Sequence, residues 1–170
     1  MKIHSFFGTI ATVVLLTLAA GCSTKSDADP QPGTGPGSAT IKLTQNGQVV
    51  TEFKTADAVG VGGGGYSLAI SSTDEKHNLT LSIDGDAPGT YPFITKTQPL
   101  TDGKANFLYQ SDALPEIYAG TTGLLSPDTG EMVLKTATKT RCSGTFKGSG
   151  KNTKDGKTYT LEGTFDTPVY

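Results

Sequence analysis

The sequence has little of the chemistry on which most enzyme sites depend. Its 170 residues include no tryptophan, two cysteines and two histidines. Beyond residue 22 only Cys142 and His77 remain, which excludes an internal disulfide and leaves zinc or Ser–His chemistry without its usual partners. The motifs Gly-x-Ser-x-Gly and His-Glu-x-x-His are absent, as is a cysteine pair at metal-ligand spacing. We therefore predict no catalytic residue, no metal ligand and no cofactor.

Helix-forming residues are not in excess either, and the composition favours β-structure. Glycine and proline together number 31 and threonine numbers 27. After residue 22 no segment has the apolar spacing of an amphipathic helix. We predict an all-β domain that is a single antiparallel β-sandwich or small β-barrel of about 8–10 short strands. Alternation of side chains is common to both architectures and leaves that choice open.

Polar and apolar residues alternate in the segments expected to be strands. Segments 40–44 and 49–53 flank Asn46-Gly47, a pair that tolerates positive φ and predicts a tight hairpin. Residues 59–65 are rich in glycine but lack the lysine of a phosphate-binding loop, which predicts a mobile loop or a connector at a strand edge. Turn-forming residues separate the other expected strands, which are 66–71, 79–83, 91–95, 105–110, 123–125, 131–136, 141–147 and 158–165.

The triplet Gly-Thr-Phe occurs twice, at 144–146 and 163–165, with a loop rich in lysine, glycine, asparagine and aspartate between the two copies. We interpret the copies as the two arms of one long hairpin. Each glycine would then allow a bulge or the close approach of a neighbouring aromatic ring.

The N-terminal segment has the pattern of an export signal. Lys2 precedes 13 uncharged residues at 6–18, a run too short to span a bilayer, which needs about 20 residues. The sequence Leu18-Ala19-Ala20-Gly21-Cys22 resembles the lipobox of bacterial lipoproteins. The resemblance implies a signal peptide at 1–21, cleavage before Cys22 and lipidation of its thiol. The alternative is an ordinary signal peptide with an incidental cysteine.

Residues 22–39 contain proline and glycine but no large apolar side chain, which predicts a flexible tether between the lipid and a β domain at 40–170. A lipid-anchored protein of the bacterial cell envelope is the expected localisation. Ser23 after the cysteine favours the outer membrane, because in lipoproteins an aspartate there signals retention in the inner membrane. The periplasmic or surface side stays open.

The C-terminal half of the chain contains a series of short motifs: Gly89-Thr90-Tyr91, Phe107 with Tyr109, Asp128-Thr129-Gly130, Ser143-Gly144-Thr145-Phe146 and Glu162-Gly163-Thr164-Phe165. With these motifs it resembles uncharacterised small β-rich envelope lipoproteins of Bacteroidota-type bacteria. The resemblance implies a fold class but no functional residues.

Basic residues gather in one part of the expected sheet. Without residues 1–21 the chain has 13 basic and 16 acidic residues, so the basic surplus of a nucleic-acid binder is missing and we predict no nucleic-acid partner. A strand face for an anionic glycan, a lipid head group or an acidic protein is a candidate. The alternative is a solvated face whose field is cancelled by acids on neighbouring strands. The candidate binding residues are Lys135, Lys139, Arg141 and Lys147.

Three single features have plainer interpretations. Cys142 has the parity of an inward-facing residue, which predicts a buried and inert thiol. His77 lies among polar residues and is expected to be a solvated side chain in a turn. Asp84-Gly85-Asp86 resembles a fragment of a calcium loop but lacks the glutamate that completes one, so a turn is expected.

Three functions remain as hypotheses. The preferred one is a lipid-anchored envelope protein of binding or structural type, without catalytic activity, whose partners are the membrane and an envelope glycan, lipid or protein. The second is a glycan- or lipid-binding module that uses the basic face. The third is a small carbohydrate-active hydrolase with a carboxylate pair, because the separation of two carboxylates is not visible in a sequence.

Overall fold

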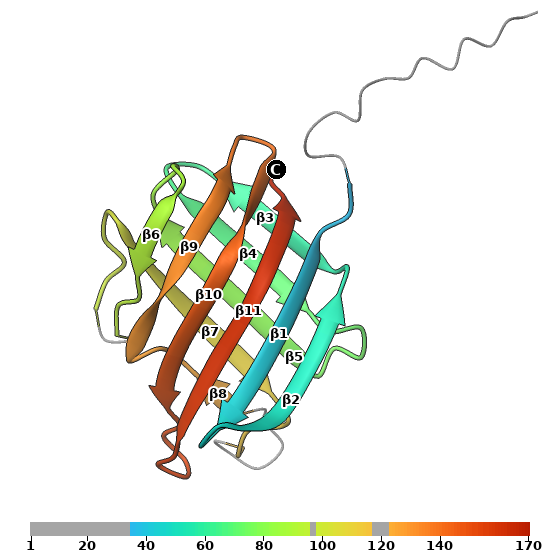
Figure 1. The fold of residues 1–170 in the computed structure, drawn as a ribbon, viewed down its shortest axis with the longest axis vertical. Helices are drawn as coiled ribbons and strands as arrows, with labels where there is room; N and C mark the ends of the chain where they lie inside the picture. Colours follow the sequence, from blue (N-terminus) through green and yellow to red (C-terminus); the bar gives the residue numbers. More distant parts are fainter. Residues whose placement is uncertain (1–34, 96–97, 117–122) are drawn as a thin grey trace, which may run out of the picture.

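Two antiparallel sheets pack face to face in the computed structural model, which describes residues 35–95, 98–116 and 123–170. Sheet A has the strand order β2-β1-β11-β10-β9-β6, and sheet B has the order β3-β4-β5-β7-β8. The strands of sheet B cross behind those of sheet A (Figure 1). The eleven strands are β1 (Ser38–Gln45), β2 (Gln48–Thr55), β3 (Ala58–Gly62), β4 (Tyr66–Ser71), β5 (His77–Asp84), β6 (Gly89–Pro92), β7 (Lys104–Ser111), β8 (Gly123–Leu125), β9 (Thr129–Ala137), β10 (Arg141–Lys151) and β11 (Thr158–Pro168).

The chain is therefore an all-β protein, and the two sheets make it a sandwich. Alternate residues of each strand are buried between the sheets, as in β4, where Tyr66, Leu68 and Ile70 point inward. Among the described residues, the ladder pairing between the edges of the two sheets consists of two isolated bridges, Gly60 with Val169 and Phe93 with Ala105. Because these bridges are single, the two sheets do not close into a continuous barrel ladder.

The first and last strands lie side by side in sheet A (Figure 1). Ser38 at the start of β1 pairs with Asp166 near the end of β11. The domain thus begins two residues before the expected position 40. Every described strand lies after residue 37, so a chain that starts at residue 23 keeps the whole described fold.

The β1–β2 hairpin forms as predicted. Asn46 has a φ of 50° and Gly47 a φ of 78°, the two positive values that a tight hairpin of this kind requires. The sequence prediction missed β3, because Ala58 and Gly60 occupy its inward positions and no large apolar residue marks them. A side chain at position 60 would collide with Leu68 and crowd Val169. The expected loop at 59–65 is therefore wrong for the residues up to Gly62.

The two Gly-Thr-Phe copies pair with each other in the β10–β11 hairpin, as predicted. Gly144 lies opposite Phe165, Phe146 lies opposite Gly163, and the two threonines face each other. A Cβ at Gly163 would lie 2.9 Å from the Phe146 ring and collide with the Thr40 carbonyl. Each phenylalanine therefore occupies the inward space that the opposite glycine leaves open. Gly144 also adjoins a register shift between β10 and β9.

Replacing Gly163 with alanine is expected to destabilise the fold by about 1–3 kcal/mol, because the added methyl overpacks a site bounded by backbone and an aromatic ring. Gly89→Ala is the matched control, since its Cβ would meet only Tyr91, at an ordinary 3.8 Å. The control should change stability by less than about 0.5 kcal/mol. Urea unfolding of both variants measures the difference. Equal unfolding midpoints would show that the close contact between Gly163 and Phe146 does not restrict the side chain at position 163.

Candidate functional site: the outer face of sheet A

The register of sheet A aligns its outward side chains in rows that run across the strands. One row, called here the charge row, alternates acidic and basic residues over five neighbouring strands. Its members in order from β2 to β9 are Glu52, Lys42, Glu162, Lys147 and Glu131. The inward neighbours of these residues form the core, so the row lies on the surface of a rigid sheet.

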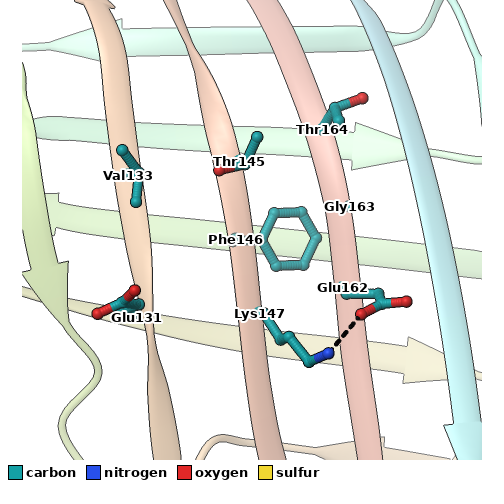
Figure 2. A pocket seen from close by; sticks show the side chains of 8 residues that line it. All are labelled: Glu131, Val133, Thr145, Phe146, Lys147, Glu162, Gly163 and Thr164. Carbon is teal, nitrogen blue, oxygen red and sulfur yellow. Dashed lines mark ion pairs between the residues drawn. The ribbon is translucent and has the colours of Figure 1, made fainter.

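Glu162 is the centre of the charge row. Its Oε1 lies 3.4 Å from Lys42 Nζ, and its Oε2 lies 3.0 Å from Lys147 Nζ (Figure 2). Lys147, and more weakly Lys42, lower the pKa of Glu162 against a smaller opposing effect of burial. The ammonium group of Lys147 is largely exposed, so each pair contributes only about 0.2–1 kcal/mol to stability.

Side-chain hydroxyls flank the charge row on both sides. On one side Thr40, Thr164 and Thr145 lie opposite one another on three strands. On the other side Thr44, Thr160 and Ser149 do the same, and the Ser149 and Thr160 hydroxyls are 2.8 Å apart. We call these the hydroxyl rows. Each hydroxyl can donate and accept a hydrogen bond, so the face offers groups of both kinds at strand spacing.

Two open hollows lie on this face and adjoin at Thr145 and Thr164. The first, of about 380 Å³, extends from these threonines over Glu131, Val133, Lys147 and Glu162 (Figure 2). The second, of about 390 Å³, extends the other way, toward Lys54, Lys135, Ser143 and Asp166. Most of the residues that line them carry a hydroxyl or a charged group beside apolar surface, which suits a ligand with both hydrogen-bonding groups and apolar faces.

The four predicted basic residues are only partly together. Lys135 and Lys147 are exposed on the outer face of sheet A, whereas Lys139 lies in the turn between β9 and β10. Arg141 donates from Nε to Asp166 Oδ1 over 2.6 Å, and this hydrogen bond raises the pKa of the guanidinium. The basic stripe is therefore interrupted by carboxylates.

Sequence reasoning did not place Glu131, Glu162 and Asp166 beside these cations. The Gly-Thr-Phe repeat could have predicted part of this arrangement. Pairing its two copies threonine to threonine sets Lys147 opposite Glu162 and Ser143 opposite Asp166, which is the observed register.

Lys139 instead lines a separate cleft of about 450 Å³ at one end of the sandwich. The glycine-rich segment Gly62–Gly65 and Asp86 line the same cleft. The features singled out at residues 59–65 and 84–86 thus meet there. Among the described residues no three His, Cys, Asp or Glu side chains are close enough to hold a metal ion.

Cys142 is buried, as predicted. Its side chain has no measurable exposure, and burial, with Asp166 as a weaker cause, raises the pKa of the thiol to about 12. The thiolate is the reactive form of cysteine, so this environment disfavours reaction at neutral pH.

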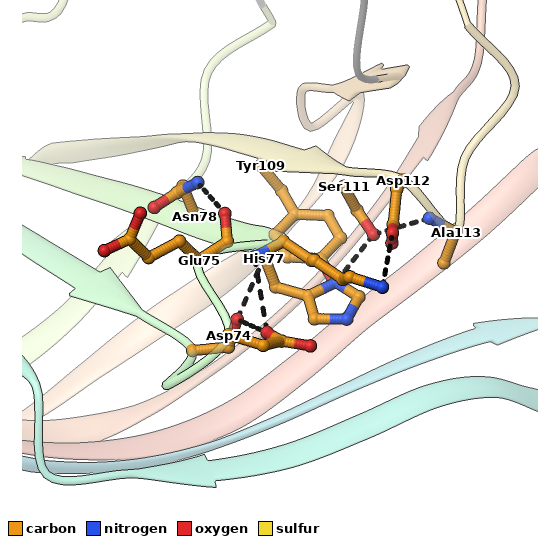
Figure 3. A network of polar contacts seen from close by, with 10 residues as sticks. Asp74, Glu75, His77, Asn78, Tyr109, Ser111, Asp112 and Ala113 are labelled. Carbon is orange, nitrogen blue, oxygen red and sulfur yellow. Dashed lines mark hydrogen bonds and ion pairs between the residues drawn. The ribbon is translucent and has the colours of Figure 1, made fainter.

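The expectation for His77 is wrong. His77 begins β5, and its ring stacks between Phe53 of sheet A and Tyr109 of sheet B, with centroid distances of 5.2 Å and 6.3 Å. Its Nδ1 lies 2.7 Å from Ser111 Oγ and 3.1 Å from Tyr109 Oη (Figure 3). Position 77 has the same parity as the inward leucines of β5, and this alternation predicts that its side chain points inward.

The His77 network joins the two sheets, and His77 itself is half-buried. Ser111 has no exposed surface, and its Oγ also accepts the backbone N–H of Ala113. Burial raises the pKa of Tyr109 to about 12. A Ser–His contact of this kind is a packing and hydrogen-bonding device, because a nucleophile must reach the group that it attacks.

The fold and this face define a two-sheet antiparallel β-sandwich with a hollowed polar surface. Residues 37–167 match the family described as domain of unknown function DUF6252, and the chain belongs to that family. No curated protein and no solved structure matches the chain. No helix among the described residues reaches the length and apolarity needed to cross a membrane.

Glu162→Gln is expected to lower stability at neutral pH by about 0.5–1 kcal/mol, because it removes the two ion pairs that one carboxylate makes with Lys42 and Lys147 on the strands to either side. The folded-state pKa of Glu162 is lowered, so its contribution is complete above the ordinary glutamate pKa of about 4.3 and is lost as pH falls through the lowered value. Unfolding free energies of wild type and variant should therefore converge in acid.

Glu131→Gln is the control for this prediction. Glu131 ends the charge row and makes no ion pair among the described residues. A loss that persists at low pH, or an equal loss in the control, would contradict an electrostatic origin.

Proposed function

We propose that this protein is a lipid-anchored binding protein of a bacterial cell envelope and that the outer face of sheet A binds a glycan. The observation that carries the binding proposal is the alignment of the charge row between two hydroxyl rows, with two adjoining hollows over part of the charge row and over the hydroxyl row of Thr40, Thr164 and Thr145. A glycan presents hydroxyl groups that donate and accept, and it can use every polar group of such a face.

The alternating charges bear on the kind of glycan. A polyanion that reached Lys147 would also meet Glu131 and Glu162, which lie opposite Lys147 on the two neighbouring strands. Like charges this close oppose binding. The face therefore favours a neutral or zwitterionic glycan over a strongly anionic one.

The anchor rests on the lipobox pattern at Leu18–Cys22. Ser38, the first residue of β1, follows Cys22 by 16 residues. A coil of that length has an end-to-end distance of about 22 Å. Lipidation of Cys22 would thus hold the sandwich close to a membrane while leaving the face of sheet A accessible to envelope glycans.

The anchor is tested by Cys22→Ser in the full chain, produced in a bacterium that is fed a labelled fatty acid. Wild type should take up the label and fractionate with membranes, whereas the variant should take up none. Cys142→Ser is the control and should be labelled like wild type, because the buried thiol is not the acceptor. If the wild type took up no label, residues 1–21 would be an ordinary signal peptide and the lipid anchor would be ruled out. If Cys22→Ser were still labelled, the lipid would be attached to another residue.

The binding face is tested by screening residues 23–170 against neutral, zwitterionic and anionic bacterial glycans and against lipid vesicles, at low and moderate salt. For a glycan that binds, the double variant Thr145→Val and Thr164→Val should weaken affinity by about tenfold or more, since each lost hydrogen bond is worth about 1 kcal/mol. Thr158→Val is the control, because Thr158 is exposed on β11 outside both hollows.

Other results of this screen would contradict the proposal. Unchanged affinity in the double variant would show that the glycan binds outside this face. Salt-sensitive binding that is lost on charge reversal at Lys139 and Arg141 would favour the basic-residue hypothesis instead. Turnover of a glycan would show a hydrolase.

A further inference from the structure

The outer face of sheet B has the opposite chemistry to that of sheet A. It is formed by the outward side chains of β3, β4, β5, β7 and β8, and we call it the uncharged face. Asp84 and Lys104 lie opposite each other at one end of it. Between that end and the far end of these described strands, no outward side chain is charged.

The outward side chains of the uncharged face are mostly serine, threonine, asparagine and glutamine, and exposed apolar side chains lie among them. One row over four strands consists of Val59, Ala69, Thr80 and Leu108. Val59 is 45% exposed and Leu108 is 42% exposed. Val61, on the same side of β3, is 60% exposed, and with Leu100 it lines a hollow of about 370 Å³.

Depletion of charge is one compositional mark of the centre of a protein interface, and exposed valine and leucine side chains gain from being covered. Charged residues make up about a quarter of an average protein, and the charge row shows that this chain places them freely on its other sheet. A face that only meets water would gain no stability from excluding charged residues. The composition therefore points to contact with another surface.

The surface that covers this face has to lack charge as well. A charged group buried against it would lose its hydration and, away from Asp84 and Lys104, meet no opposite charge. Neither the outer face of sheet A nor the segment 22–34, which carries Lys25, Asp27 and Asp29, meets that requirement. A membrane with anionic lipids attracts lysine and arginine, whereas Lys104 is the one basic residue on these described strands and it lies opposite Asp84.

We propose that the uncharged face is the interface of a homodimer. The same face of a second copy matches it in lacking charge, and a two-fold axis would bring each copy's valine and leucine side chains together. Five strands at about 4.8 Å spacing and about six residues at 3.3 Å cover on the order of 400–500 Å² per copy. The resulting total, close to 1,000 Å², reaches the lower limit of specific interfaces and fits a weak dimer.

Sedimentation velocity of residues 23–170 over a wide range of concentration tests the proposal. The wild type should shift from monomer to dimer as concentration rises. Leu108→Lys places a charge in the middle of the face and should raise the dimer dissociation constant at least tenfold. Thr90→Lys puts the same charge at an exposed position on sheet A and should leave the dimer unchanged.

Val61→Lys is a second variant, at a more exposed position, and keeps the test decisive if Leu108→Lys folds poorly. Its thermal unfolding should match that of wild type while its dimer weakens. A wild type that stays monomeric at every concentration would overturn the proposal, as would equal dissociation constants for Val61→Lys and Thr90→Lys. Flotation of the monomer with vesicles of anionic and zwitterionic phospholipid, lost in Val61→Lys, would assign the face to a membrane instead.

Discussion

The register of the β10–β11 hairpin depends on a reciprocal contact between two glycines and two phenylalanines. Gly144 makes room for Phe165, and Gly163 makes room for Phe146. Slipping the hairpin by one residue would set each ring against a threonine, or against Ser143 and Glu162 in the other direction, and would turn the side chains of one strand to the other face of the sheet. The packing of the core thus fixes which side chains meet on the surface, and the charge row exists because this register brings Lys147 opposite Glu162.

Glycine has the same effect further along β10. Gly148 and Gly150 also point inward, and a Cβ at Gly148 would collide with the rings of Phe93 and Phe107. Those two rings meet edge to face, with centroids 5.2 Å apart, between the sheets. Because the inward side of β10 is mostly glycine, aromatic rings from other strands lie directly under it. A central strand with little side-chain volume can therefore support a well-packed core.

Local patterns in the sequence were sufficient for the all-β class, for the Asn46-Gly47 hairpin and for the pairing of the Gly-Thr-Phe copies. They failed where the inward residues are small, as in β3, or polar, as at His77. The choice between sandwich and barrel depends on how the sheet edges meet, and one of the bridges there joins Gly60 to Val169, near the other end of the domain. For the candidate site, the strand parity of the lysines was visible, but the carboxylates beside them depend on the register between strands.

The two outer faces impose opposite requirements on whatever binds them. Covering the charge row with an apolar surface would remove water from five charged groups that exposed ion pairs compensate only weakly, so its ligand must bring hydrogen-bonding groups. Covering the uncharged face with a charged surface would remove water from those charges and offer them only neutral partners, so its occupant must be uncharged. The two faces cannot exchange roles, and a dimer formed through sheet B would present two copies of sheet A on its opposite outer surfaces.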